Sequence, residues 1–199
     1  MKSLHRSDLY TWSTYDTERN IDFNGIAWIR PEGNILIDPV HLSSHDMAHL
    51  SALGGAAWVV ITNSDHVRAA LSISKVFEAQ VAGPAAEKDT FPMECHRWLA
   101  EGDELVPQLK VFEMKGSKTP GELMLLLEGT TLITGDLVRA HRAGSLMILP
   151  DDKLQNRAEA VASVQRLAEM SDIEAVLVGD GWSVFRDGHR RLKELAAAL

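Results

Sequence analysis

Residues 56–68 read AAWVVITNSDHVR, an apolar run that ends directly in a polar loop. A short, nearly continuous apolar run is typical of a strand that is buried on both faces. Two further apolar runs end in the same way, in TGDLVRAHR (134–142) and VGDGW (178–182). Because the carboxyl ends of strands hold loop side chains rigidly in α/β proteins, we expect the chemistry of this chain at these three loops.

Strand and helix patterns continue on both sides of this stretch. The turn sequences PEG (31–33) and Glu128-Gly129 separate neighbouring strand patterns, which predicts two hairpins. Two strand-rich blocks, each followed by strand–helix alternation, predict an α/β fold in which two sheets are in contact and helices lie outside. The predicted strands are 9–14, 25–30, 34–38, 56–62, 109–114, 122–128, 130–134 and 173–178, and the predicted helices are 43–53, 66–77, 154–170 and 183–199.

The composition indicates one globular domain over residues 1–199. Hydrophobic residues make up 45% of the chain and charged residues 24%, which is enough for a packed core and argues against disorder. The net charge of −8 argues against nucleic acid as a partner. Cys95 is the single cysteine, which excludes an intrachain disulfide and a zinc site built from several thiolates. The chain has no signal-peptide pattern and no membrane-spanning run, so we expect a cytoplasmic protein that is not a membrane partner, with homo-oligomerisation left open.

Four short motifs occur in order along the chain: ITNSDH (61–66), SKTPGE (117–122), TGD (134–136) and GDG (179–181). This series resembles the metallo-β-lactamase-fold superfamily, whose usual pattern is an HxHxDH loop, a GHTPGS-like turn, a TGD and a GHG. No single motif is specific, but four in register on the expected elements make a strong signal. The resemblance implies an αββα sandwich of two mixed β-sheets flanked by helices, and it covers about residues 10–190.

The metal-binding residues that the resemblance implies are only partly present. An alignment on Asp65-His66 places Ile61 and Asn63 at the first two histidines of the pattern, and Lys118 stands at the third. A two-residue deletion would set Asn63 against the first histidine, with the same loss. The three-histidine metal position is therefore gone.

The second metal position of the family is better preserved. Asp65, His66 and Asp136 match its usual ligands, and Asp180 stands in for its usual histidine. Three carboxylates and one imidazole suit manganese, magnesium or iron(II) at least as well as zinc. The expectation is one divalent metal ion (zinc, manganese or iron) or none.

Lys118 suggests how the chain compensates for the missing charge. Clustered carboxylates repel one another unless a cation is near. Our hypothesis is that Lys118 pairs with Asp136 and partly replaces the lost metal ion. The hypothesis allows two states of the site. In one, a single metal ion is bound by Asp65, His66, Asp136 and Asp180; in the other, Lys118 and water alone balance the charge of the carboxylates.

Two functions remain open at this point. The first is a single-metal hydrolase of an ester, thioester, lactone or phosphoester, in which Asp65 or Asp136 orients the attacking water and Lys118 stabilises the developing oxyanion. The second is a metal-free, non-catalytic descendant whose cleft binds a small metabolite or a protein partner. The loss of three histidines favours the second function, and the four retained ligands favour the first.

Three further residues are candidates for contact with a small-molecule substrate. Arg68 could bind a carboxylate or phosphate, or equally pair with Asp65 or Glu87. His141 lies in the segment 139–152, which either shapes substrate access or merely connects two elements. Trp182 either forms a wall of the cleft or fills the core.

Overall fold

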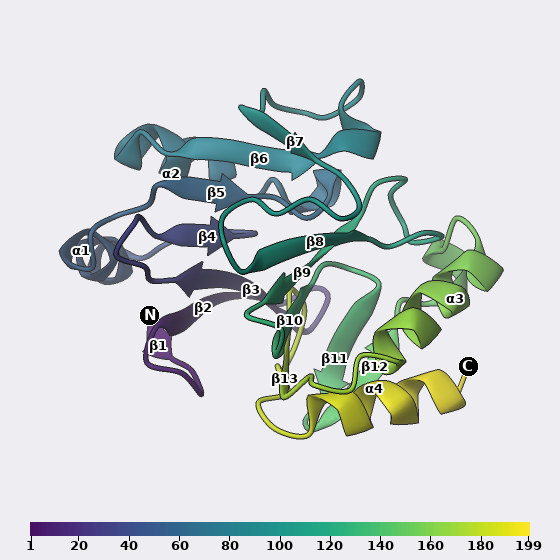
Figure 1. The fold of residues 1–199 in the computed structure, drawn as a ribbon. Helices are drawn as coiled ribbons and strands as arrows, with labels where there is room; N and C mark the ends of the chain where they lie inside the picture. Colours follow the sequence, from purple (N-terminus) through teal and green to yellow (C-terminus); the bar gives the residue numbers. More distant parts are fainter.

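The chain folds into two β-sheets and a separate hairpin, described for residues 1–199 by a computed structural model (Figure 1). The first sheet has the strand order β1-β2-β3-β4-β5-β6-β7, antiparallel up to β4 and parallel from β4 to β7. Its strands are β1 (Lys2–Ser3), β2 (Leu9–Asp16), β3 (Ile21–Trp28), β4 (Ile35–Ile37), β5 (Trp58–Val60), β6 (Gln80–Pro84) and β7 (Arg97–Leu99).

The second sheet has the order β13-β10-β9-β8, and only the β10–β13 pair is parallel. A two-stranded hairpin, β11–β12, follows the second sheet's β10 in the chain. The strands are β8 (Leu109–Glu113), β9 (Leu123–Leu127), β10 (Thr131–Thr134), β11 (Val138–Arg142), β12 (Ser145–Ile148) and β13 (Ala175–Val178).

Two pairs of α-helices lie on opposite sides of the sheets (Figure 1). Helices α1 (Ser44–Ala52) and α2 (Ala70–Phe77) accompany the first sheet, and α3 (Arg157–Ala168) and α4 (Gly188–Ala197) accompany the second. Short 3₁₀ turns are η1 (Ser64–His66), η2 (Ala85–Glu87) and η3 (Asp151–Lys153). No helix of the chain is both long and apolar enough to cross a lipid bilayer.

Alternating side chains divide the core into three apolar layers. Along β13, Leu177 faces the layer between the two sheets, whereas Val176 and Val178 face the layer that contains residues of α3 and α4. Along β4, Ile35 and Ile37 face the middle layer, and Leu36 faces the layer with α1 and α2. Successive strand residues point to opposite faces, so strands in a helix–sheet–sheet–helix stack need apolar residues at every position. The fold is therefore the αββα sandwich of two mixed sheets that the resemblance implied.

Most predicted elements form, and the exceptions have physical reasons. The hairpins at 31–33 and at Glu128-Gly129 are confirmed by antiparallel β3–β4 and β9–β10 pairing. The helix predicted over 66–77 is wrong at its start, because Arg68 has a positive φ of 41°, and α2 begins only at Ala70. Strands β6 and β7 were not predicted, since β6 contains Gly83 and Pro84 and β7 has only three residues.

Candidate functional site

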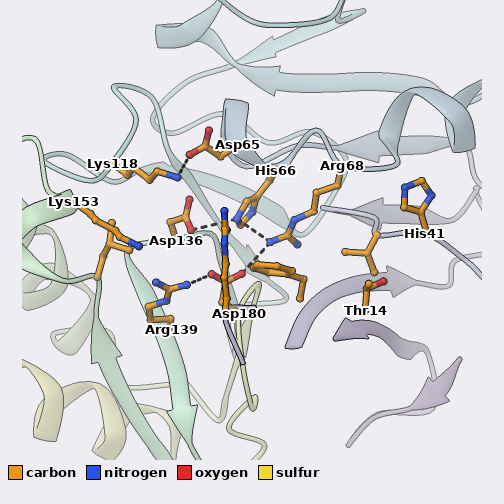
Figure 2. Close-up of a pocket in the computed structure, with 14 residues that line it drawn as sticks. Thr14, His41, Asp65, His66, Arg68, Lys118, Asp136, Arg139, Lys153 and Asp180 are labelled. Atoms are coloured by element: carbon orange, nitrogen blue, oxygen red, sulfur yellow. Dashed lines mark hydrogen bonds and ion pairs between the residues drawn. The ribbon is translucent and has the colours of Figure 1, made fainter. Parts of the chain in front are cut away.

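A cleft of about 330 Å³ opens where loops from both sheets meet (Figure 2). The loops after β5, β10 and β13 border it, which are the three carboxyl-end loops expected from the sequence. Hydrogen bonds join the sheets here, from Asn24 N to the Gly179 carbonyl at 2.8 Å and from Leu123 N to the Thr62 carbonyl at 2.7 Å. The lining residues are Thr14, Arg19, Phe23, Val40, His41, Asp65, His66, Arg68, Lys118, Asp136, Arg139, Leu149, Lys153 and Asp180.

His66 is fixed at the base of the cleft by a buried carboxylate. Asp38 directly follows β4, and its Oδ2 atom lies 2.7 Å from His66 Nδ1. Asp38 also accepts hydrogen bonds from the backbone N and the hydroxyl of Thr62, at 2.7 and 2.6 Å. Burial lowers the pKa of His66, but the charge of Asp38 and the hydrogen bonds to Asp136 and Asp38 outweigh it, and the pKa is raised. The imidazole therefore has one fixed orientation, with Nε2 toward the cleft.

Asp136 lies beside His66 at the start of the loop after β10. Its Oδ1 atom is 3.5 Å from His66 Nε2, and its Oδ2 accepts a hydrogen bond from Asn63 Nδ2 at 3.3 Å. Burial would raise the pKa of this carboxyl, but the hydrogen bond and charge of His66, with the charges of Lys118 and Arg139, hold it well below its usual range. Asp136 is thus a buried anion at the base of the cleft.

Asp180 is held by two guanidinium groups. Arg68 Nη2 lies 3.0 Å from Asp180 Oδ1, and Arg139 Nη2 pairs with Oδ2. The same Nη2 atom of Arg68 lies 3.1 Å from His66 Nε2, so that it bridges the imidazole and the carboxylate. Arg68 Nη1 donates to the Asn24 carbonyl at 3.1 Å, and its guanidinium carbon lies 5.0 Å from the centre of the Phe23 ring.

Six of the predicted site residues line this one cleft, and three converge at its base. His66, Asp136 and Asp180 each offer a ligand atom, and these atoms lie within 4.8 Å of one another. Asp65 is not part of this group but forms an ion pair with Lys118 near the cleft mouth, where both side chains are about 40% exposed (Figure 2). The hypothesis that Lys118 pairs with Asp136 is therefore wrong in its partner, although the charge of Lys118 still acts on Asp136.

The remaining predictions concern Arg68, His141 and Trp182. Arg68 lines the cleft, but its carboxylate partner is Asp180 rather than Asp65 or Glu87. His141, on β11, and Trp182, which is 60% exposed, are not among the lining residues. Glu87 is buried outside the lining of the cleft, and it accepts hydrogen bonds from Ser64 N and Gly121 N.

Three residues of the site had no individual role in the sequence pattern: Asp38, Arg139 and Lys153. The signal for Asp38 was present, since it follows an apolar strand just as Asp65, Asp136 and Asp180 do. Arg139 and Lys153 lie at the two ends of a segment that contains β11, β12 and η3, which the sequence left open as a connection. Arg139 lies on the β11–β12 hairpin and Lys153 on the following η3, and both line the cleft.

A comparison with known families agrees with this architecture. The sequence profile described as "Metallo-beta-lactamase superfamily" matches residues 1–199. The chain belongs to this superfamily. A search of curated protein sequences finds no significant match.

Several solved structures share the fold of this superfamily member at low sequence identity. A metallo-beta-lactamase from Pontibacter korlensis is 15% identical with a TM-score of 0.77, covering 98% of this chain and 97% of its own. The enzyme FIM-1 from Pseudomonas aeruginosa, solved in a mono-zinc form, is 14% identical with a TM-score of 0.73, covering 96% and 90%. TTHA1623, solved in a di-iron-bound form, is 18% identical with a TM-score of 0.68, covering 87% and 94%.

The donor set at the base of the cleft raises the question of a metal ion. One imidazole and two carboxylates are ligand types that zinc, manganese and iron(II) accept. Arg68 Nη2, however, lies 3.1 Å from His66 Nε2 and 3.0 Å from Asp180 Oδ1, so it joins the two atoms that an ion would have to join. Arg139 engages the other oxygen of Asp180. In this metallo-β-lactamase superfamily member, the arrangement does not fit a resident ion unless Arg68 moves away.

Proposed function

We propose that this member of the metallo-β-lactamase superfamily binds a small molecule in its cleft without a metal ion and without hydrolysing it. The observation that carries the proposal is the position of the Arg68 guanidinium between His66 Nε2 and Asp180 Oδ1. A fixed guanidinium supplies one permanent positive charge to the carboxylates in place of a metal ion. Lys118, which stands at the third histidine of the family pattern, supplies a second positive charge and pairs with Asp65.

The positions of the other site residues support binding rather than hydrolysis. Each buried anion of the base is matched by a cation of the chain, since Asp180 faces two arginines and Asp136 faces His66. A charge-balanced network of this kind is rigid, which favours a preformed binding site. The net charge of −8 favours a small molecule over a nucleic acid as the ligand.

A single-metal hydrolase of an ester, thioester, lactone or phosphoester is the second candidate. The observation in its favour is that the ligand atoms of His66, Asp136 and Asp180 lie within 4.8 Å of one another. Solved neighbours contain one zinc ion or two iron ions. This function requires Arg68 to leave the space between His66 and Asp180.

Metal uptake separates the two candidates. The untagged protein is treated with chelator, offered zinc, manganese or iron(II), passed through a desalting column and analysed by mass spectrometry for metals. We expect less than about 0.1 equivalent of each metal in the parent chain. The Arg68→Met variant should retain more metal, because loss of the guanidinium leaves the three ligands open to an ion.

Two further variants complete this experiment. Arg190→Met removes an exposed arginine of α4, and it should retain as little metal as the parent. Asp136→Asn removes a proposed ligand. About one equivalent of metal in the parent chain, lost in Asp136→Asn, would contradict the metal-free function and support the hydrolase.

A further inference from the structure

The side chains around the cleft carry an excess of positive charge in an otherwise acidic protein. Five of the lining residues are arginine or lysine and three are aspartate, while the whole chain has a net charge of −8. A concave site whose sign opposes that of the molecule concentrates ligands of the opposite charge. The basic residues are Arg19, Arg68, Lys118, Arg139 and Lys153, and the acidic ones are Asp65, Asp136 and Asp180.

Two of the acidic residues are already engaged by three of these cations, and the third, Asp136, lies beside His66. Asp180 pairs with Arg68 and Arg139, and Lys118 pairs with Asp65. Lys153 has no carboxylate within 4.0 Å, and it extends from η3 toward the cleft beside Asp136 (Figure 2). Arg19 has only Asp16, at the limit of 4.0 Å. Lys153 and Arg19 therefore carry positive charges that no carboxylate of the cleft neutralises. Asp180 neutralises only one of the two charges on Arg68 and Arg139, so one further positive charge remains there.

Arg139, which also lines the cleft, has an unsatisfied hydrogen-bond donor. The residue is only 7% exposed, yet its Nε atom has no hydrogen-bond partner. Buried donors are almost always satisfied, so the guanidinium of Arg139 is held in the wall of the cleft with one of its donors unused. A guanidinium donates charge-assisted hydrogen bonds to a carboxylate or a phosphate.

We propose that the ligand of this cleft is a small dianion, a phosphate monoester or a dicarboxylate, bound between Lys153 and Arg139. The inference rests on the proposed metal-free binding function and names its ligand class. Lys153 and Arg19 carry positive charges that no close carboxylate neutralises, which favours a ligand with more than one negative charge. The cleft volume of about 330 Å³ is near the lower end for ligand pockets, which indicates a molecule of few heavy atoms.

Calorimetric titration of the full chain tests this proposal. The probes are glycerol 3-phosphate, succinate, inorganic phosphate and, as the neutral analogue, glycerol. We expect at least one of the first two to bind with a Kd below about 1 mM at low salt, and glycerol not to bind. Affinity should fall as ionic strength rises, because exposed charges are screened. Binding of inorganic phosphate alone would identify an ion site and overturn the organic ligand.

Lys153→Gln tests the position of the anion. Lys153 is exposed, so the variant is expected to fold, and loss of one charged contact should weaken dianion binding about tenfold. Lys75→Gln, on the exposed face of α2 and outside the cleft, is the matched control and should keep the parent affinity. Unchanged affinity in Lys153→Gln, or equal binding of glycerol, would overturn the proposal.

Repeating the titrations with chelated and with zinc-supplied protein separates the two proposals. Dianion binding by the chelated protein supports both the metal-free function and the ligand class. Dianion binding that occurs only with zinc would overturn the metal-free function and leave the ligand class in place. Failure of all dianions to bind up to about 10 mM, in a chain that also takes up no metal, would overturn the ligand class alone.

Discussion

Glu122 is a carboxyl group that the fold buries directly behind the base of the cleft. It is 1% exposed, and its Oε1 accepts a hydrogen bond from Leu137 N at 2.9 Å, while Ser117 donates to Oε2. Burial and the charge of Asp136 raise the pKa of Glu122 to about 8. Glu122 is therefore a neutral acid at neutral pH, and Asp136 carries the negative charge of this pair.

This raised pKa predicts how stability depends on pH. The folded chain binds the Glu122 proton more tightly than the unfolded chain, whose pKa is near 4.5, so the stabilisation is complete below pH 4.5 and is lost as pH rises toward 8. We expect the free energy of unfolding in urea to fall by about 2–5 kcal/mol between pH 5 and pH 8. Glu122→Gln, which cannot ionise, should make this slope shallower and be more stable than the parent at pH 8.

Ionisation of His66 and of Asp136 also affects how the stability of the chain depends on pH. The raised pKa of His66 adds loss of stability with rising pH above about 6.5, so Glu122→Gln removes only part of the slope. The lowered pKa of Asp136 acts only below about pH 3.8, outside the range tested. Glu113→Gln, at a half-buried position on β8, is the control. An identical slope in parent and Glu122→Gln would show that Glu122 titrates normally.

At the scale of elements, the loop after β13 is shaped so that Asp180 enters the cleft. Gly181 has a φ of +91°, and its N–H donates to the Asp22 carbonyl at 2.8 Å. Asn24 Nδ2 donates to the Gly181 carbonyl at 2.7 Å. A Cβ atom on Gly181 would overlap the Ala140 carbonyl of β11. The turn thus binds β13 to β3 and β11 at once, and only glycine satisfies both its dihedral angle and its close contact.

Gly181→Ala is therefore expected to destabilise the chain by about 3 kcal/mol or more, because it adds backbone overlap to the strain of a positive φ. Gly129→Ala is the matched control, since Gly129 has a φ of +73° but a Cβ atom added there would meet nothing within 4 Å. It should cost only about 1–2 kcal/mol. Urea unfolding of both variants measures the difference, and equal losses would refute the close contact at Gly181.

At the scale of the whole molecule, the two sheets share one apolar layer. Leu125 of β9 lies in this layer together with Ile37 of β4 and Leu177 of β13. The cleft lies at one edge of the same sandwich, so its loops depend on the packing of both sheets. Because neither sheet can bury its inner face alone, we expect the sheets to unfold together.

Leu125→Ala tests this dependence. Leu125 is fully buried, and its truncation should lower the free energy of unfolding by about 2–5 kcal/mol. Far-ultraviolet and near-ultraviolet circular dichroism should report one coincident urea transition in parent and variant. Leu71→Ala, at a residue of α2 that is 48% exposed, should change stability by less than about 0.5 kcal/mol. Two separate transitions in the parent would contradict the predicted single domain.

The sequence by itself determined the αββα layers and the position of the cleft. Continuous apolar runs such as 56–62 indicate strands covered on both faces, and polar residues directly after them indicate where strands end. These features depend on residues that are neighbours in the sequence, so the sequence alone is enough to predict them. The β11–β12 hairpin was not predicted, because three of the five residues of VRAHR are basic and β12 has only four residues.

Only the tertiary structure decided which charges pair. Lys118 joins Asp65 instead of Asp136, and Arg68 reaches Asp180, 112 positions away, to lie between that carboxylate and His66. Ion pairs depend on separations below about 4 Å between side chains from different loops. No local pattern encodes such distances, so the position of the Arg68 guanidinium, on which the proposed function rests, could not be predicted from the sequence.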